Sequence, residues 1–435
     1  MLLIVLVREI SPACLSIVIS FLAVTLATRE INCIRATAFI PYGSTEFYLF
    51  WMLCISFLVI ALSRISLNVR APDRKLRSLI CLFVINLMFV FLFFLVQSII
   101  WFYLIFEISV IPIFLMVAGW GYQPERIKSS YAIMFYTIVS SVPILIIIIT
   151  VLRWRVATGL EVQGKRFRGR LGFIVACSLR IGFLVKLPMY GVHVWLPLAH
   201  VEAPVYGSII LAGILLKLGG IGVIRLISFI INPNRVSIFV SISVLGIVLV
   251  GWQCLKITDI KSIIAFSSVA HIGIVIIVII MGVKIFVWSA YFIILTHAFS
   301  SSGIFFGRYI IYKVTGRRNM LLNKGGLRIY PAFGLCWLIV VMASLGTPPF
   351  INLASEVYSI MLSYNVLGLI SLFIILIFML GSAYHLALYR SSQQEHGRWD
   401  RKSIRSRPES IAFIVCHYHR IVIVLRFLSL SVLGY

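Results

Sequence analysis

The chain has 435 residues, of which 61% are hydrophobic and only 12% are charged, and its mean hydropathy is +1.09. This composition excludes a soluble globular protein and predicts an α-helical membrane protein with many spans. The formal net charge is +25, but the Lys and Arg residues cluster in short connections, where they orient loops and meet anionic headgroups, so we expect no nucleic-acid partner.

Apolar segments of membrane-spanning length follow one another along the whole chain. The alternating ten-residue segments of a transmembrane β-barrel are not evident. We therefore expect an all-α polytopic protein with one integral membrane domain over residues 1–435. About thirteen spans are predicted, at 5–27, 47–67, 78–97, 98–118, 129–152, 172–200, 205–230, 237–255, 262–281, 285–311, 330–363, 366–390 and 411–433.

Two of these segments, 172–200 and 330–363, are longer than one crossing needs and contain internal prolines. Proline removes a backbone hydrogen bond, so each is predicted to be a broken helix. Each is also the fourth of five spans in a set, and an odd number of spans inverts the second set relative to the first. The layout is typical of an inverted-repeat transporter. It predicts N-terminal helices in 1–77, a first five-helix repeat in 78–230, a second in 237–390 and a C-terminal helix region in 391–435.

Five ionisable residues lie deep within the apolar spans: Glu107, Lys186, Lys217, His297 and Glu356. A charge at bilayer depth costs at least about 2.5–3.5 kcal/mol, so such groups face a polar interior or a partner. Burial disfavours the charged form of each group, and an opposite charge nearby restores it, so a buried Glu–Lys pair can act as a protonation switch. These residues predict a proton or ion path.

Helical spacing indicates where Lys217 points. Gly213 and Gly220 lie four residues before it and three residues after it, so the three share one helix face. Small residues mark helix–helix contacts in membranes, and we therefore expect Lys217 to point into the bundle. His297 and Glu356 each share a face with other polar residues at the same spacings.

Four further ionisable residues are supporting candidates: His193, His200, Glu202 and His271. His200 and Glu202 lie near a span boundary, and the alternative is that they only fix the turn there. A lone intramembrane histidine is often a structural hydrogen-bonding group, which is the alternative for the other two. Lys186 has an alternative as well, because a lysine near a span end often extends to the headgroups.

The sequence offers no sign of bound metal, nucleotide or flavin. Its eight cysteines are scattered singly, without a C-x-x-C pair, which argues against a zinc site or an iron–sulfur cluster. P-loop, dinucleotide-binding, H-E-x-x-H and G-x-S-x-G motifs are not found. We expect this chain to bind no cofactor and no metal.

Several segments resemble one known family. The central segment 186–220 reads KLPMYGVHVWLPLAHVEAPVYGSIILAGILLKLGG, and shorter matches are FEISVIPIF, TDIKSIIAFSSVAHIGIVI, HAFSSSGIFFGRYIIYKVTGRR and PPFINLASEVYSIM. Together they resemble the subunit 4 family of mitochondrial NADH:ubiquinone oxidoreductase, respiratory complex I. The resemblance runs from about Leu79 to Tyr389 and follows the family order.

The resemblance implies an antiporter-like, proton-translocating subunit of the membrane arm, in the mitochondrial inner membrane. It implies that Glu107 pairs with Lys186 and that Lys217, His297 and Glu356 continue the proton route. NADH, FMN, the iron–sulfur clusters and ubiquinone would all be used by other subunits. The chain would thus be part of an enzyme, a proton-translocating NADH:ubiquinone reductase, without redox chemistry of its own.

The implied partners are neighbouring antiporter-like subunits, accessory subunits and phospholipid such as cardiolipin. Two basic tracts, 153–170 and 391–407, have no clear family counterpart, and we expect them to dock accessory subunits or cardiolipin. Two alternatives to the function remain: a subunit of a related cation/proton antiporter, and a structural scaffold without its own proton path.

Overall fold

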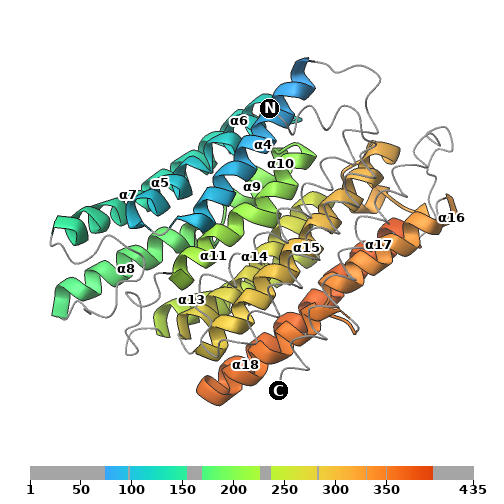
Figure 1. Ribbon diagram of the computed structural model, residues 1–435. Coiled ribbons are helices and arrows are strands. Elements are labelled where there is room, and N and C mark those ends of the chain that lie inside the picture. The colour runs from blue at the N-terminus through green and yellow to red at the C-terminus, as the bar shows by residue number, and fades with distance from the viewer. Residues whose placement is uncertain are drawn as a thin grey trace, which may run out of the picture. The chain divides into compact units, whose positions relative to one another are not determined.

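The computed structural model describes residues 74–96, 98–153, 169–225, 237–281, 284–329, 331–348 and 350–394 (Figure 1). Over these ranges the chain folds into helices and connections, with no strand longer than an isolated bridge. The predicted all-α fold is confirmed. The expected spans 5–27, 47–67 and 411–433 lie outside the described residues.

The helices of the first half fall on the expected spans. They are α4 (Arg74–Leu95), α5 (Ile99–Ile108), α6 (Ile111–Trp120), α7 (Arg126–Arg153), α8 (Gly169–Lys186), α9 (Trp195–Glu202), α10 (Val205–Ile210), the π-turn η1 (Leu211–Leu215) and α11 (Leu216–Arg225). One detail differs from the prediction: the single span expected at 98–118 is two short helices, α5 and α6.

After Arg225, the described residues form seven further elements. They are α13 (Ser237–Lys256), α14 (Ile260–Met281), α15 (Lys284–Thr315), the 3-10 turn η3 (Met320–Leu322), α16 (Gly326–Ile329), α17 (Pro331–Ser344) and α18 (Ile351–Gln393). Within the described ranges, seven segments are long and apolar enough to cross a membrane. The protein is therefore a multi-pass membrane protein.

Both helix breaks that the prolines predict are present. Helix α8 ends at Lys186, Pro188 follows in the connection, and α9 begins at Trp195. Helix α17 ends at Ser344, and α18 begins seven residues later. Gly346 in the second break has a φ of +68°, a conformation that residues with a side chain rarely adopt.

Helix α18 reverses direction along its length. Glu356 and His385 lie 29 residues apart, which corresponds to about 43 Å in a straight α-helix. Both nevertheless contact His271, the carboxylate at 3.8 Å and the imidazole at 6.3 Å between ring centroids. The chain must turn back between them, as the two spans expected at 330–363 and 366–390 require.

The segment 205–225 and helix α14 form the interior of the described bundle. The first is buried over its whole apolar length and the second over most of it. In Figure 1, α11 and α14 lie between α7 and α8 on one side and α17 and α18 on the other. The interior helices therefore carry their ionisable side chains away from the surface of the bundle.

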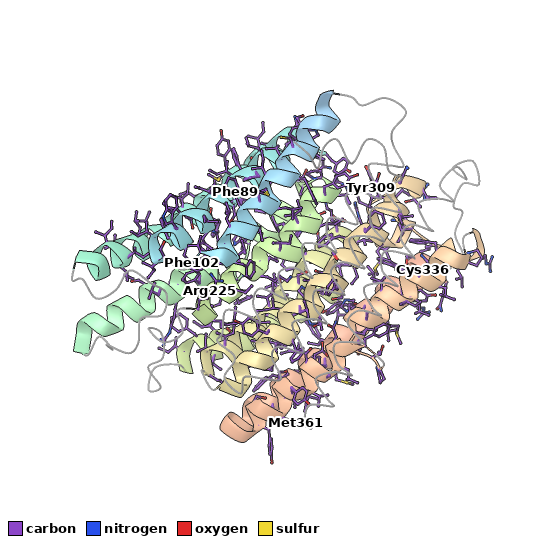
Figure 2. All side chains as sticks on the ribbon, viewed as in Figure 1. Phe89, Phe102, Arg225, Tyr309, Cys336 and Met361 are labelled. Atoms are coloured by element: carbon purple, nitrogen blue, oxygen red, sulfur yellow. The ribbon has the colours of Figure 1, made fainter. Side chains whose placement is uncertain are left out.

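Arg225 joins the end of α11 to the end of α4. Its guanidinium donates to the carbonyl oxygens of Phe93 and Phe94, both at 2.9 Å, and lies 5.7 Å from the ring centroid of Phe102. Figure 2 shows Phe102 and Arg225 next to each other at this end of the bundle. The last carbonyls of α4 are orphan acceptors, so a cation here satisfies them.

Candidate functional site

Lys186, the last residue of α8, reaches the end of α5. Its Nζ lies 3.3 Å from Oε1 of Glu107 and donates a hydrogen bond of 2.6 Å to the carbonyl of Phe106. The ammonium also lies 3.2 Å from the ring centroid of Phe106. The Lys186 side chain is 1% exposed and that of Glu107 is 19% exposed. The structure thus brings the predicted pair together and places the lysine inside the bundle.

A break between α5 and α6 makes this contact possible. Pro112 in the first turn of α6 has no N–H to donate, so the helix is interrupted at Ser109. The Ser109 hydroxyl donates to Phe106 O at 2.8 Å, and the amide of Asn86 donates to Ser109 O at 2.8 Å. The interruption leaves the Phe106 carbonyl available to Lys186. We predicted no break in this span, although Pro112 lies inside it.

Lys217 lies two residues after the π-turn η1, in the first turn of α11. Its ammonium donates to the carbonyl of Ala212, which lies inside that turn, and its side chain is 3% exposed. A π-turn closes i→i+5 hydrogen bonds, so it shifts the register of the helix relative to a regular α-helix. The predicted face shared with Gly213 and Gly220 assumed regular α-helical spacing, and it stays a prediction across this turn. Lys217 nevertheless points inward.

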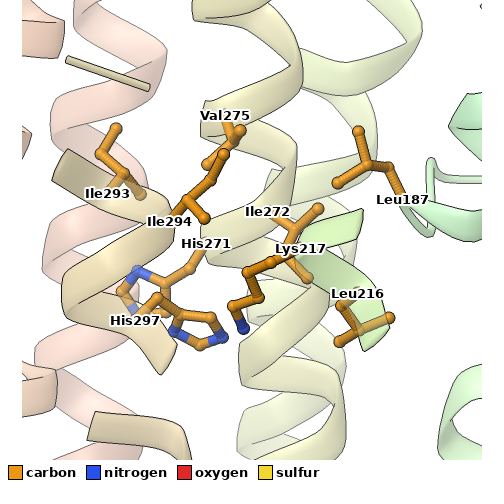
Figure 3. A pocket seen from close by; sticks show the side chains of 9 residues that line it. All are labelled: Leu187, Leu216, Lys217, His271, Ile272, Val275, Ile293, Ile294 and His297. Atoms are coloured by element: carbon orange, nitrogen blue, oxygen red, sulfur yellow. The ribbon is translucent and has the colours of Figure 1, made fainter. Parts of the chain in front are cut away.

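Lys217 and two histidines line one small cavity (Figure 3). His271 comes from α14 and His297 from α15, and their rings lie 5.2 Å apart between centroids, inclined by 30°. In Figure 3 the Lys217 ammonium and the imidazole of His297 lie on the same side of the cavity. The remaining lining residues are aliphatic: Leu187, Leu216, Ile272, Val275, Ile293 and Ile294. The polar groups therefore face one another in an otherwise apolar enclosure.

His271 links this cavity to Glu356. Its Nδ1 lies 3.8 Å from Oε1 of the Glu356 carboxylate, and that side chain is buried against Gly346. Sequence reasoning gave His271 only a supporting role. The structure places it between His297 and Glu356, two residues of the predicted route.

His385 is a member of this group that sequence reasoning missed. Its ring lies 6.3 Å from that of His271 between centroids, and its Nδ1 is 2.9 Å from the carbonyl of Gly381. The side chain is 4% exposed. A signal was available, because His385 is an ionisable residue within an apolar span and meets the same criterion as His297.

The three other supporting residues lie elsewhere. His193 stacks on Tyr190 with ring centroids 5.1 Å apart. His200 stacks on Phe305 at 4.6 Å, and neither of its ring nitrogens has a hydrogen-bond partner among the described residues. Glu202 is 4% exposed at the end of α9. The structure thus brings none of the three directly into the cavity.

Close backbone packing separates the Glu107–Lys186 pair from the cavity. Gly219 of α11 lies against the first break, so that a Cβ at this glycine would be 3.0 Å from the backbone nitrogen of Leu187. Leu187 also lines the cavity. Leu187, which follows Lys186 in sequence, therefore packs against α11 and lines the cavity at the same time.

In the part of the chain that the structure describes, no three His, Cys, Asp or Glu side chains are grouped as a metal site requires. The clustered groups are instead of the kinds that exchange protons, namely carboxylate, imidazole and amine. Proton transfer requires such groups within hydrogen-bond reach or one water apart. The arrangement is chemically suited to moving protons through the interior.

Comparison with known proteins identifies the family. Residues 96–383 match the family described as NADH:quinone oxidoreductase/Mrp antiporter, TM. NADH-ubiquinone oxidoreductase chain 4 of Ceratitis capitata is 39% identical over 326 residues, which are 72% of this chain and 70% of that protein. The chain 4 of Artemia franciscana is 36% identical over 365 residues, 81% and 89% of the two chains.

Solved structures share the fold. A chain of respiratory complex I from Thermus thermophilus with bound NADH has a TM-score of 0.76 and 18% identity, over 87% of this chain and 80% of that one. A chain of the membrane-bound sulfane sulfur reductase, an archaeal respiratory membrane complex, has a TM-score of 0.74 and 16% identity, over 86% and 63%. These likenesses concern the fold alone.

Proposed function

The chain belongs to the family of NADH-ubiquinone oxidoreductase chain 4, and on this premise we propose that it is a proton-translocating subunit of the membrane arm of respiratory complex I. In this role it is a subunit of NADH:ubiquinone reductase, while NADH, FMN, iron–sulfur clusters and ubiquinone are used by other subunits. Its place is the mitochondrial inner membrane, beside other antiporter-like subunits. Its two basic tracts, 153–170 and 391–407, dock accessory subunits or cardiolipin.

The proposed route begins at the Glu107–Lys186 pair and continues through Lys217. From Lys217 the proton passes to His297 and ends at Glu356. The stacking of His271 on His297, and its 3.8 Å contact with Glu356, add His271 to this route. The observation that carries the proposal is this cluster from four helices, because no packing role requires an amine and two imidazoles in one apolar enclosure with a carboxylate 3.8 Å from one of the imidazoles.

Pair switching supplies the coupling step. While Glu107 is ionised beside Lys186, each stabilises the charge of the other. Moving the carboxylate away leaves a buried ammonium without its counter-charge, and a proton then leaves the lysine for the next acceptor. A conformational or electrostatic signal from quinone reduction elsewhere in the complex would drive that movement.

The two alternatives make different predictions. A related cation/proton antiporter shares the family description and the fold, but the relatives of the greatest identity named above are chain 4 proteins of the NADH-ubiquinone oxidoreductase. A scaffold without a proton path requires no clustered ionisable groups. It also predicts that neutral substitutions alter assembly but not the number of protons moved per electron.

The test replaces Glu107 with Gln in the assembled complex and measures NADH oxidation and proton uptake together in sealed vesicles. Glu125→Gln is a matched control, because Glu125 is exposed in the connection between α6 and α7. We expect coupled turnover to fall about tenfold or more for Glu107→Gln and to stay unchanged for Glu125→Gln. Unchanged turnover and unchanged protons per electron in Glu107→Gln would support the scaffold instead.

A further inference from the structure

Asn86 is a polar residue enclosed in the apolar helix α4. Its side chain is fully buried, and its amide nitrogen donates to the carbonyl oxygen of Ser109 at 2.8 Å. The other amide atom, Oδ1, has no hydrogen-bond partner among the described residues. Burying an amide costs free energy unless its polar atoms are bonded. An amide that is kept in the interior for a single hydrogen bond therefore points to a use for that bond.

The bond ends on the backbone between α5 and α6, where the hydrogen-bond pattern of a regular helix is interrupted. In a regular helix the N–H of Val110 would donate to the carbonyl of Phe106, four residues earlier. Here it donates to the carbonyl of Glu107 instead, at 3.1 Å. The Phe106 carbonyl is thereby released, and it accepts from Lys186 Nζ at 2.6 Å and from the Ser109 hydroxyl at 2.8 Å. The acceptor that binds the lysine is available because the helix is interrupted.

Asn86 holds this interrupted backbone from outside. Ser109 is the second residue after Glu107 and the third after Phe106, and its side chain is fully buried. Carbonyls at a helix end need donors from outside that helix, and Asn86 supplies one from α4. If that donor is removed, the buried carbonyl of Ser109 has to find another one, and the neighbouring peptide groups turn with it. A change at Asn86 therefore displaces the two groups that Lys186 contacts.

A second asparagine makes the same kind of bond at the second break. The amide of Asn352, in the first turn of α18, donates at 2.5 Å to the carbonyl of Ala343, in the last turn of α17. Glu356 follows one turn after Asn352, and its carboxylate lies against Gly346 inside the break. The carboxylates at the two ends of the proposed route thus each lie beside a break that an asparagine amide bridges. This recurrence in both halves favours a role in the route over a role in one local contact.

We propose that Asn86 is a positioning residue for proton transfer at the Glu107–Lys186 pair, which it holds in contact through the interrupted backbone at Ser109. The inference rests on the proton transport proposed above. Asn86 carries no proton of the route, because its amide does not titrate. When the carboxylate of Glu107 moves away, the Phe106 carbonyl is the acceptor that still holds the lysine. The balance between the protonation states of the pair therefore depends on the Asn86 bond.

The test measures NADH oxidation and proton uptake of the assembled complex in sealed vesicles over a range of pH. Asn86→Leu removes the donor and keeps the size of the side chain. Asn86→Ser removes it without adding an apolar group, because helical serines of this chain donate to carbonyls of their own helix, as Ser130 does to Ile127 O. Asn86→Gln keeps an amide donor and is the rescue variant. Native gels measure the amounts of assembled complex.

Asn323→Leu is the matched control. Asn323 is also fully buried, and its amide donates to the carbonyls of Arg317 at 3.1 Å and Asn319 at 3.0 Å, in the connection that follows α15. The variant thus removes bonds of the same type away from the pair. Lys186→Met, alone and combined with Asn86→Leu, shows whether Asn86 acts through the pair.

We expect Asn86→Leu and Asn86→Ser to lower coupled turnover about tenfold and to shift the pH profile of proton uptake by about half a unit or more, because misplaced proton-transfer groups lose rate steeply. Asn86→Gln restores most of the turnover. Asn323→Leu lowers the thermal stability of the complex and leaves the pH profile unchanged. Adding Asn86→Leu to Lys186→Met causes no further loss, since residues that act through one contact are not additive.

A wild-type pH profile in Asn86→Leu and Asn86→Ser would overturn the positioning role and leave the proposed function standing. A further loss on adding Asn86→Leu to Lys186→Met would also overturn it, because Asn86 would then act elsewhere. Should Asn86→Leu fail to assemble, Asn86→Ser decides, alone and combined with Lys186→Met. Wild-type proton uptake in Lys186→Met would overturn the proposed function itself.

Discussion

At the level of single residues, three buried lysines are stabilised in the same way, by hydrogen bonds to backbone carbonyl oxygens. Each binds backbone carbonyl oxygens that regular helix geometry would have used: at the end of α5 for Lys186, inside the π-turn for Lys217, and at the end of α9 for Lys261. An ammonium in a bilayer interior needs acceptors. Helix ends and π-turns provide them, because their carbonyls are not all paired within the helix.

A substitution at Gly346 tests whether proton uptake depends on the position of the Glu356 carboxylate. A Cβ at this glycine would overlap the Glu356 carboxylate, and its φ of +68° is unfavourable for alanine. We expect Gly346→Ala to destabilise the protein by about 1–3 kcal/mol from backbone strain alone and to lower proton uptake by displacing Glu356. Gly316→Ala is the control, since its φ of +67° gives the same strain with open space around it. Equal proton uptake in the two variants would contradict the prediction.

The two histidines near Glu356 differ in their expected importance. His271 lies between His297 and Glu356, whereas His385 contacts only the His271 end of this group. We predict that His271→Gln lowers coupled proton uptake about tenfold or more and that His385→Gln has a smaller effect. Proton uptake and NADH oxidation in sealed vesicles measure both. A larger loss in His385→Gln would place the route along α18 instead.

Irregular elements position the site. The breaks at Ser109, after Lys186 and after Ser344 each lie beside an ionisable side chain, and the π-turn η1 lies beside Lys217. Regular helices carry the partners, His271 on α14 and His297 on α15. The lysines and carboxylates of the site thus lie at helix interruptions, and the continuous helices α14 and α15 hold these interruptions in place.

The contact between α11 and the first break is testable with adjacent glycines. A Cβ at Gly219 would meet the backbone of Leu187 at 3.0 Å, whereas a Cβ at Gly220 would meet only the flexible tip of Ile294 at 3.0 Å. Overpacking typically costs about 1–3 kcal/mol, so we expect Gly219→Ala to lower the thermal stability of the complex clearly more than Gly220→Ala. Thermal unfolding of the purified complex measures this. The reverse order of stabilities would mean that the backbone at Leu187 shifts to make room for a Cβ more easily than Ile294 of α15 does.

Proline and burial rules predicted much of this arrangement from sequence, including the breaks beside Pro188 and Pro348 and the inward position of Lys217. The π-turn before Lys217 was not predictable, because such a turn leaves no reliable mark in a run such as LAGIL. Lys261 was missed because the expected span began at residue 262, whereas α14 begins at Ile260 and buries this lysine. The contact between Glu356 and His271 depends on tertiary packing, which spacing along one helix does not reveal.

At the scale of the whole molecule, ionisable residues are distributed from α5 to α18 across both halves of the described bundle. The excess of basic residues lies largely outside these spans, and gives the chain its net charge of +25. The connections therefore hold many more basic than acidic residues. Anionic lipid is the natural counter-charge for such connections in a membrane.

Neutralising the basic tracts tests this distribution. Replacing the Lys and Arg residues of 153–170 and 391–407 by Gln removes an attraction of about 1 kcal/mol per residue near an anionic surface. We expect the purified complex to lose bound cardiolipin, measured by mass spectrometry of extracted lipid. Gln at the exposed Lys128 and Arg328 is the control. A doubly neutralised complex that assembles and keeps its lipid would refute the docking role.

The direction of the interior contacts has a consequence for biosynthesis. Lys186 follows its acceptors near Glu107 by about eighty residues, Lys261 follows Val201, and Arg225 follows Phe93. In each of these contacts the acceptor is synthesised before the cation. The acceptor is a carbonyl or a carboxyl group, and both can be neutral in lipid until the cation is made. The strongly basic side chain is made only when its acceptor is already in place. During insertion, these cations need never rest in the bilayer without a partner.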